Sequence, residues 1–492
     1  MNIRYILYFT GKIMRTVALL FLFPSLIAII YGEYWNLVAF LPVGAGVFVG
    51  GWLLSLKQPN NKQLNAKEGF IIVALSWILI ALVTAVSYKI TGEIGSFIDC
   101  FFEAVSGYTT TGASVVSDVE GLSYSVNALR LFTHWVGGMG ILVLVLAIAP
   151  KDLNATSMNI FRAEVPGHQV EKFTTKITLT AKILYLVYTG MTVILFVCFV
   201  IAKMPVFDSI VHAMSIAGTG GFSVKNASLG AYGSVAIEII ATVFMILFGV
   251  NLNIFYFILI GKFKTAIKSE EFRVYIILLA VTILVISIVL TVDNTYENFG
   301  DSLRYSSFQI ASIISTTGMY VVDFSKWAIF GQSIVFALMF VGGCAGSTAG
   351  GIKLSRIMIA GKYVKNQVGA AARPNRVRTI RLEGERLDRN TVNGAMSYIG
   401  LYLGLIMASF IVMALFDNIT GMNDDFTAFE KLTSIISAVD NCGPAFGRLA
   451  TGTYADFSVI SKLILCFDML AGRLEILPML FLFNPLLWSN KN

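Results

Sequence analysis

The chain has 492 residues, of which 56% are hydrophobic and 13% are charged, with a mean hydropathy of +0.76. A soluble globular protein has roughly twice this share of charged residues, so the composition excludes that class and indicates a polytopic membrane protein. The net charge of +7 requires no nucleic acid partner, because basic loops facing anionic membrane lipid account for it.

Cysteine and histidine indicate neither a disulfide framework nor a metal centre. The five cysteines are odd in number and scattered, and His134, His168 and His212 include no pair at metal-ligand spacing. No GxGxxG motif follows a predicted strand, and no segment outside the membrane is long enough for a nucleotide-binding domain. We therefore expect no organic cofactor on this chain.

Two apolar segments, at about 17–31 and 37–55, lie near the start of the chain. No convincing small-residue cleavage site follows them, so we predict two retained transmembrane helices rather than a signal peptide. Further runs, such as those at 69–88 and 398–416, reach the roughly 20 apolar residues needed to cross the hydrocarbon layer as a helix.

The basic residues predict which connections face the cytoplasm. They concentrate near the N-terminus, at Arg4, Lys12 and Arg15, and in four connections between apolar segments. These connections span residues 57–67, 151–182, 262–273 and 362–389. By the positive-inside rule they are cytoplasmic, as is the N-terminus, and the acidic connections between them face outward.

A polar stretch recurs four times on the predicted outer side, each time with a serine followed six residues later by a glycine. The stretches read "SGYTTTG", "SIAGTGG", "SIISTTG" and "SAVDNCG", from Ser106 to Gly112, Ser215 to Gly221, Ser312 to Gly318 and Ser437 to Gly443. A run too short to span a membrane precedes each stretch, and a linker and another apolar segment follow it. This pattern predicts four repeats of long helix, re-entrant half-helix, polar loop and long helix.

Irregular backbone is tolerated at membrane depth only where it lines water or is buried by protein, so the four loops should line one axis. Rings of backbone carbonyls on such an axis replace the hydration shell of a monovalent cation, and the C-terminal ends of the half-helices direct partial negative charge toward it. Glycine permits the positive φ that such a loop requires. The alternative interpretation is glycine-rich helix kinks or tight packing contacts.

The segment "GGCAGSTAGGIK", at 342–353, interrupts the last helix of the third repeat. Its glycines each disfavour a helix by up to about 1 kcal/mol relative to alanine. We predict that the segment folds beneath the polar loops as a gate. Close helix packing through small residues is the alternative.

These elements predict an all-α polytopic membrane protein with ten spanning helices and four re-entrant half-helices around one pore. The predicted units are two N-terminal transmembrane helices at 1–68, repeat 1 at 69–182, repeat 2 at 183–273, repeat 3 with the intramembrane gate loop at 274–392, and repeat 4 at 393–492.

Five motifs resemble the TrkH/TrkG and KtrB superfamily of potassium transporters. They are "VSGYTTTGAS" (105–114), "HWVGGMGI" (134–141), "GGFS" (220–223), "GGCAGSTAGGIKLSR" (342–356) and "MLAGRLEILPMLFLFNPLLW" (469–488). The resemblance covers nearly the whole chain, and the two extra N-terminal helices favour the TrkH branch. It implies a pore-forming subunit of the bacterial inner membrane that carries K⁺ inward, as a single-chain relative of tetrameric potassium channels.

The resemblance also implies which residues form the K⁺ selectivity filter. They are Thr109, Thr110, Thr111, Gly112, Gly218, Thr219, Gly220, Gly221, Ser315, Thr316, Thr317, Gly318, Asp440, Asn441, Cys442 and Gly443. Asp440 departs from the family pattern, which has a neutral residue, often Asn, at this place. Its carboxylate either deepens the cation well or points away and anchors the loop, and we favour the second.

The gate residues implied in the same way are Gly342, Gly343, Gly346, Ser347, Thr348, Gly350, Gly351, Lys353 and Arg473. Charges inside a membrane are costly, so the two basic residues are candidates for function. Arg473 would raise an electrostatic barrier below the filter, with Glu475 or another acid as partner, or else form a structural ion pair. Lys353 would either act in the gate or extend to the inner interface.

Two other functions are consistent with some of these residues. A Na⁺- or H⁺-coupled K⁺ symporter is one, with Glu238 as a possible proton relay, although the sequence shows no inverted repeat and no pair of buried acids. An intramembrane serine hydrolase is the remote one, and it would require Ser347 and His134 to pair. A hydrogen-bonded packing role is the simpler interpretation of His134.

Because the chain lacks a nucleotide-binding domain, regulation should come from a partner. The resemblance implies a homodimer with a separate cytoplasmic nucleotide-binding ring of the TrkA type. The basic connection at 362–389 is the candidate docking surface by charge alone, and a solvated positive-inside loop explains it equally well.

Overall fold

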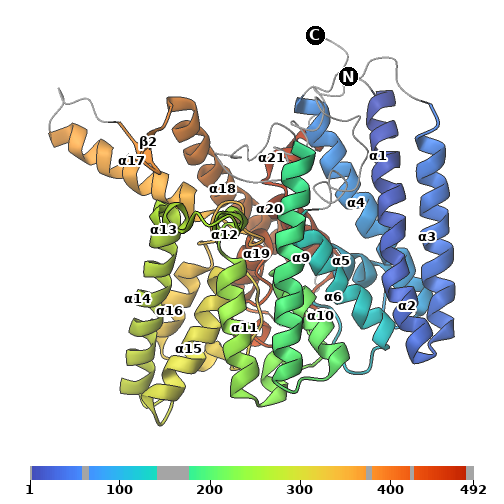
Figure 1. The fold of residues 1–492 in the computed structure, drawn as a ribbon, viewed down its shortest axis with the longest axis horizontal. Coiled ribbons are helices and arrows are strands. Elements are labelled where there is room, and N and C mark those ends of the chain that lie inside the picture. The colour runs from blue at the N-terminus through green and yellow to red at the C-terminus, as the bar shows by residue number, and fades with distance from the viewer. Residues whose placement is uncertain (1–2, 58–65, 141–176, 373–378, 421–425, 484–492) are drawn as a thin grey trace.

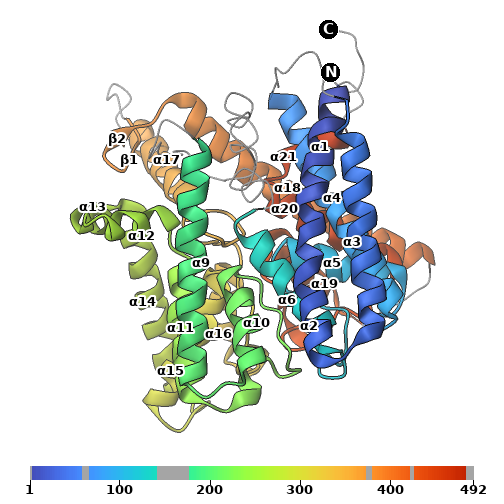
Figure 2. The same cartoon turned by 45° about the vertical axis from the view of Figure 1, so that its right-hand side comes forward.

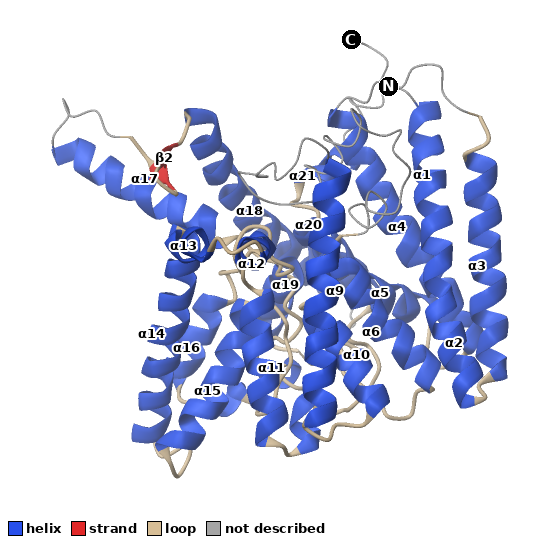
Figure 3. Ribbon diagram, in the orientation of Figure 1, coloured by secondary structure: helices blue, strands red, loops and turns tan. Residues whose placement is uncertain are grey.

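The structure is a computed structural model that describes residues 3–57, 66–140, 177–372, 379–420 and 426–483. In this part of the chain a short antiparallel hairpin, β1 (Arg381–Leu382) with β2 (Glu385–Arg386), is the only sheet, and helices make up the other regular elements (Figure 3). The predicted all-α class is confirmed. Most of the predicted inner connections at 57–67 and 151–182, residues 373–378 of the connection at 362–389, and the end of the motif at 469–488 lie outside the described residues.

The N-terminal pair of helices is present. Helix α1 (Ile3–Ala18), a 3₁₀ turn η1 (Leu19–Phe21) and α2 (Leu22–Tyr31) form one 29-residue span, and α3 (Tyr34–Leu54) returns beside it (Figure 1). The first helix begins well before residue 17, because its amphipathic first turns bury Phe9 and Ile13 against the neighbouring helices. Gly11 and Gly51 let α1 and α3 approach closely, since a Cβ on either would lie within 3.0 Å of the other's carbonyl oxygen.

In the rest of the described chain, a long helix followed by a short helix and one or more further helices occurs four times, and we call each group a unit. Unit 1 contains α4 (Ala66–Thr91), α5 (Phe97–Tyr108) and α6 (Tyr124–Gly138). Unit 2 contains α9 (Ile177–Ile201), α10 (Val206–Ala217), η3 (Ser228–Tyr232), α11 (Val235–Phe248), α12 (Leu252–Leu259) and α13 (Phe263–Lys268). Unit 3 contains α14 (Glu270–Val292), α15 (Phe299–Ile314), η4 (Phe324–Lys326), α16 (Ile329–Leu338) and α17 (Leu354–Ala372). Unit 4 contains α18 (Arg389–Thr420), α19 (Ala428–Asp440), η5 (Gly447–Leu449), α20 (Val459–Arg473) and α21 (Leu477–Phe483).

Six described helices are long and apolar enough to cross a membrane, or seven if the bent pair α11 and α12 is one span. They present large apolar side chains outward, such as Leu186, Ile277 and Ile411, as lipid-facing helices do. The helices that follow the polar loops, α6, α11, α16 and α20, are shorter than this. Helix α11 continues into α12 only after a bend of 94° (Figure 2). The total of ten spanning helices stays a prediction.

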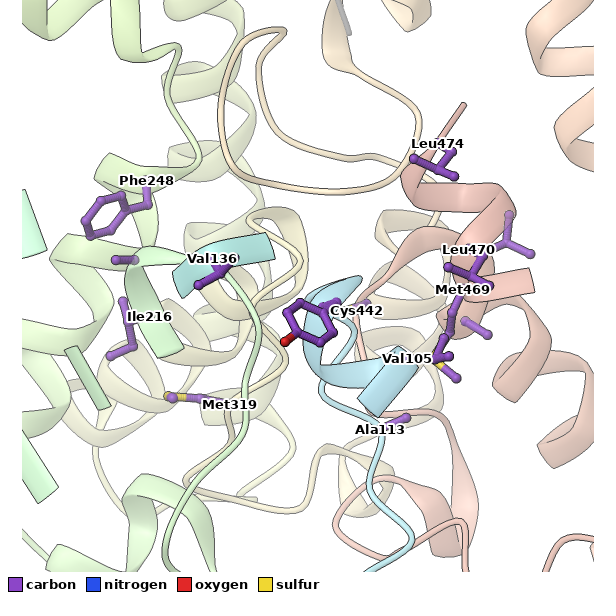
Figure 4. Packing of buried hydrophobic residues seen from close by; sticks show 14 of the residues in the cluster. Val105, Ala113, Val136, Ile216, Phe248, Met319, Cys442, Met469, Leu470 and Leu474 are labelled. Carbon is purple, nitrogen blue, oxygen red and sulfur yellow. The ribbon is translucent and has the colours of Figure 1, made fainter. Parts of the chain in front are cut away.

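Each of the short helices α5, α10, α15 and α19 packs against the long helix that precedes it in the chain (Figures 1 and 2). Capping boxes start two of them, formed by Ser96 with Asp99 and by Thr427 with Glu430. Residues from all four units pack into one buried cluster, among them Val105, Ile216, Met319 and Cys442 (Figure 4). This packing brings the C-terminal ends of the four short helices to one place.

Candidate functional site: a ring of four loops above a glycine-rich segment

The four predicted loops share one backbone conformation. We number them loop 1 (109–112), loop 2 (218–221), loop 3 (315–318) and loop 4 (440–443). The second residue of each loop is left-handed, with φ of 56° at Thr110, 54° at Thr219, 54° at Thr316 and 55° at Asn441. The fourth residue is a glycine, with φ of 81° at Gly112, 81° at Gly221, 73° at Gly318 and 97° at Gly443. Glycine adopts this region without the strain that a Cβ would add.

The same hydrogen bonds end each short helix. The N–H of the third loop residue donates to the carbonyl of the repeated serine, from Thr111 to Ser106 (3.0 Å), Gly220 to Ser215 (3.0 Å), Thr317 to Ser312 (2.8 Å) and Cys442 to Ser437 (3.0 Å). With a left-handed residue just before it, this bond forms a Schellman motif, which satisfies carbonyls left open at a helix C-terminus. The recurring six-residue spacing from serine to glycine therefore corresponds to the last turn of the short helix followed by one loop.

The four loops form a closed ring. A Cβ on the glycine of each loop would lie within 3.0 Å of the third carbonyl oxygen of another loop. The pairs are Gly112 with Gly220, Gly221 with Thr317, Gly318 with Cys442, and Gly443 with Thr111. Loop 1 thus contacts loop 2, loop 2 contacts loop 3, loop 3 contacts loop 4, and loop 4 contacts loop 1. All the residues expected to form a filter lie in this ring.

The side chains of the ring do not repeat four times. In loops 1 and 3 a pair of hydroxyls faces each other, Thr109 with Thr111 at 2.8 Å and Ser315 with Thr317 at 2.7 Å. Loops 2 and 4 have no such pair, because glycines occupy both positions in loop 2, and Asp440 and Cys442 occupy them in loop 4. The four backbones are alike, whereas the polar groups behind them alternate around the ring.

The carboxylate of Asp440 lies behind loop 4. It is fully buried, and its Oδ1 accepts a hydrogen bond from the hydroxyl of Tyr402 in α18, at 3.4 Å. A Cβ on Gly351 would meet the same oxygen within 3.0 Å. The carboxylate thus contacts α18 and the glycine-rich segment, and its role as an anchor stays a prediction.

The glycine-rich segment connects α16 to α17 as a loop closed at its base. The N–H of Gly342 donates to the carbonyl of Ile352 at 3.0 Å, and that of Leu354 donates to Gly343 at 3.1 Å. Gly346 and Gly351 have φ of 75° and 67°, so the chain reverses at positions that favour glycine. The segment is therefore a compact loop rather than a helix–helix packing motif.

This loop contacts the ring directly. The N–H of Gly350 donates to the hydroxyl of Thr316 in loop 3, at 2.7 Å. Gly350 also packs against the carbonyl of Asp440 in loop 4, where a Cβ would not fit. The predicted gate segment thus lies against two of the four loops.

Unit 2 contacts the same segment directly, just beyond α11, and unit 1 is joined to it through Arg473 of unit 4. The N–H of Cys344 donates to Gly249 at 2.9 Å, just beyond α11. Arg473 of α20 donates to Thr348 of the segment at 2.9 Å, and to Gly137 and Gly138 of α6 at 2.6 and 2.7 Å. The segment is therefore connected to all four units.

The expectation that Lys353 reaches the interface is corrected, whereas the pairing of Arg473 with an acid stays a prediction. Glu475, considered as the partner of Arg473, accepts hydrogen bonds from Arg356 at 2.7 and 2.9 Å. Lys353 does not extend to the interface, because it is 5% exposed and its ammonium group donates to the carbonyls of Ala349 and Gly350 inside the segment. Lys353 turns inward because the turn of the segment leaves the carbonyls of Ala349 and Gly350 without helical partners.

The residues weighed for other functions have structural partners. His134 Nδ1 lies 3.1 Å from the hydroxyl of Ser215, and its ring stacks on Phe222 at 4.2 Å. Ser347 donates to the carbonyl of Cys344 at 2.7 Å. The packing role of His134 is confirmed, and the two residues do not form the pair that a serine hydrolase requires. Glu238 forms an ion pair with Arg304 at 3.3 Å.

Sequence reasoning missed Glu271, in the first turn of α14. Its buried carboxylate accepts the N–H of Ala345 in the glycine-rich segment at 2.9 Å and that of Ser355 in α17 at 3.0 Å. An acid in the first turn of a long apolar helix is usually explained by the helix dipole, so the sequence carried no separate signal. Glu271 therefore joins the glycine-rich segment to the first turn of α17.

Replacing Glu271 with alanine is expected to raise ion flux at least about tenfold, because hydrogen bonds to a charged group are each worth roughly 1.5–3 kcal/mol and both act on the proposed closed gate. Rubidium uptake into liposomes measures it. Glu270→Ala is the matched control, since Glu270 faces Lys362 instead. Equal fluxes for the wild type and Glu271→Ala would contradict a gating role for this contact.

The apolar helices and the ring of polar loops define a helical membrane transport protein. The family model TrkH, described as a cation transport protein, matches residues 44–492. The chain belongs to the TrkH family of cation transport proteins, which confirms the resemblance seen in its motifs. The relatives and the fold are those of a transporter and not of an enzyme.

Known relatives align over the whole length. The chain is 32% identical to the Trk system potassium uptake protein TrkH of Salmonella typhimurium, covering 99% of this chain and 100% of the relative. It is 30% identical to the Trk system potassium uptake protein TrkG of Escherichia coli K12, covering 99% of each. The crystal structure of the potassium transporter TrkH from Vibrio parahaemolyticus superposes with a TM-score of 0.87 at 28% identity, covering 99% of this chain and 100% of that one.

Proposed function

We propose that the chain is the pore-forming membrane subunit of a Trk-type K⁺ uptake system and carries K⁺ inward through the ring of four loops. The names of the full-length relatives state potassium uptake, which supports K⁺ as the transported ion. The observation that carries the proposal is the closed ring, in which four left-handed turns and four positive-φ glycines bring backbone carbonyls together. Such carbonyls replace the hydration shell of a dehydrated cation.

The glycine-rich segment is the gate in this proposal. Its contacts with loops 3 and 4 support a closed position directly against the ring. Arg473 adds a positive charge at the same level, which opposes the passage of a cation. Opening would break the Gly350–Thr316 and Arg473–Thr348 hydrogen bonds together, so ion flow and gate position would be coupled.

A coupled H⁺/K⁺ symporter is the second candidate, because the structure corrects one expectation. The sequence indicated no pair of buried acids, yet Asp440 and Asp468 are both fully buried in unit 4. Asp468 accepts a hydrogen bond from Ser409 of α18 at 2.7 Å, seven residues along from the Tyr402 that contacts Asp440. A relay of buried acids is typical of proton-coupled membrane transport. A Na⁺-coupled symporter stays the other coupled alternative.

The proposed assembly is a homodimer in the bacterial inner membrane, with a cytoplasmic N-terminus and a separate nucleotide-binding ring of the TrkA type. The hairpin β1–β2, in the candidate docking connection, supports a route to the gate. Its Glu383 accepts the N–H groups of Glu270 and Glu271 at 2.8 and 3.0 Å, and Glu271 in turn holds the gate segment. A partner that moved the hairpin would therefore act on the gate through two contacts.

The purified chain in liposomes tests the proposal, with Rb⁺ entry followed while K⁺ or Na⁺ competes outside. With no Na⁺ or proton gradient, we expect entry that K⁺ blocks far better than Na⁺. Entry that requires an imposed gradient would favour the coupled symporter. Equal competition by the two ions would overturn the assignment of the four loops as a K⁺ filter.

A further inference from the structure

Two of the four short helices carry a buried side chain that holds the chain just after a loop. The position three residues before the repeated serine is fully buried in every unit, as Glu103, His212, Gln309 and Ser434. The position two residues after the loop glycine is a serine in units 1 and 2, Ser114 and Ser223. In these two units the two positions contact each other.

In unit 1 the contact is made by a carboxylate. The hydroxyl of Ser114 donates to Glu103 at 2.9 Å and the N–H of Val115 donates to it at 3.0 Å. Ser114 in turn accepts the N–H of Val116 at 3.1 Å. Arg130 of α6 neutralises the carboxylate, with a nitrogen-to-oxygen distance of 2.6 Å and both side chains almost completely buried. Breaking such a pair is costly, so the arrangement is rigid.

In unit 2 an imidazole takes the same place. His212 Nδ1 lies 2.8 Å from the carbonyl of Asp208, so this nitrogen carries the proton. The other nitrogen, Nε2, is then an acceptor, and the hydroxyl of Ser223 donates to it at 3.0 Å. Ser223 accepts the N–H of Lys225 at 2.9 Å, as Ser114 accepts that of Val116. Ser114 and Ser223 therefore make matching hydrogen bonds, each donating to the buried side chain and accepting the N–H two residues on.

Arg130 connects the two contacts. Besides Glu103, its guanidinium donates to Ser114 at 3.2 Å and to the carbonyl of Ser223 at 3.5 Å. It also lies over the ring of Phe222, 4.4 Å from the centroid. Glu103, Arg130, Ser114, His212 and Ser223 therefore form one network behind loops 1 and 2, which we call the filter clamp.

Loops 3 and 4 are held differently. Ala445 stands at the serine position of unit 4 and has no side-chain polar group, and Tyr320 of unit 3 donates its hydroxyl to the carbonyls of Asn226 and Thr451. Ser434 donates to Lys431 within its own helix at 2.7 Å. The clamp therefore acts on one half of the ring.

We propose that Glu103 and His212 are positioning residues for ion selection, which fix the spacing of the ring carbonyls by holding Ser114 and Ser223. This inference rests on the proposed K⁺ filter and deepens it. A ring discriminates K⁺ from Na⁺ through the number and position of its carbonyls, so loosening half of the ring lets it close around the smaller ion. Neither positioning residue belongs to the ring.

The test is Rb⁺ uptake with K⁺ or Na⁺ as competitor, in Ser114→Ala, Ser223→Ala and the double variant. These changes remove one hydroxyl each and leave the buried charges of Glu103 and Arg130 paired. One lost hydrogen bond should reduce the preference for K⁺ over Na⁺ by about fivefold, and the double variant should lose more. Ser114→Thr and Ser223→Thr, which keep the hydroxyl, should retain the preference. Ser434→Ala is the matched control and should match the wild type.

Three outcomes would contradict the proposal or the filter on which it rests. Reduced uptake of all ions with an unchanged K⁺/Na⁺ preference would show a purely structural contact and overturn the proposal. An unchanged preference in the folded double variant, seen as a monodisperse species with wild-type melting, would overturn it as well. A wild-type chain without K⁺ preference would instead refute the filter itself.

Discussion

Replacing Gly318 with serine is expected to reduce the preference for K⁺ over Na⁺ by more than about tenfold. The residue has a φ of 73°, and a left-handed conformation costs a residue with a Cβ roughly 1–2 kcal/mol, where 1.4 kcal/mol corresponds to a factor of ten. The added Cβ would also meet the carbonyl oxygen of Cys442 within 3.0 Å. The substitution therefore displaces a ring carbonyl, which is the group proposed to bind the ion.

The measurement is competition of K⁺ and Na⁺ with Rb⁺ uptake into liposomes. Gly112→Ser tests the same contact in loop 1, where the Cβ would meet Gly220 of loop 2. Gly300→Ser is the control, because this glycine of α15 has open space around its Cβ position. An unchanged preference in both Gly318→Ser and Gly112→Ser would refute the filter assignment.

Deleting residues 345–350 is expected to raise ion flux by roughly tenfold or more. If the open form is a minor state, populated at roughly 0.1–10%, removing the closed form exposes the path permanently. The neck of the segment lies outside the deletion, since its hydrogen bonds join Gly342 to Ile352 and Gly343 to Leu354. The two ends of the deletion can therefore rejoin near the existing neck.

The initial rate of Rb⁺ uptake measures this effect, compared at equal amounts of reconstituted protein. The K⁺/Na⁺ preference serves as the internal control and should stay close to that of the wild type, because the ring itself is intact. Reduced or unaltered flux in a well-folded deletion variant would count against the segment as a gate. A rise in flux with loss of preference would mean that the segment also supports the ring.

The two experiments separate two parts of one site. Gly318 contacts loop 4, and the segment contacts Thr316 only two residues away. A variant that changes the K⁺/Na⁺ preference and not the ion flux reports on the ring. A variant that changes the ion flux and not the preference reports on the gate. Arg473, which joins α6 to the segment, is assigned to the gate.

The loops were predictable from the sequence because their signals are local. The distance from Ser106 to Gly112, repeated three times, reflects a Schellman helix end followed by a positive-φ glycine, and both depend on residues adjacent in the chain. The membrane class, the short helices before the loops and the break at 342–353 follow from apolar length and glycine content in the same way. The boundaries of the four repeats stay predictions.

Only the tertiary structure decided which distant groups meet. It assigned Glu475 to Arg356, turned Lys353 inward and placed Glu271 against Ala345, 74 residues further on. A carboxylate or ammonium group in a sequence has many candidate partners, and burial decides among them, since a charge removed from water must find whichever polar group the packing brings near it. The sequence by itself determined four equal backbone turns, and the packing of four units determined that they close into a ring.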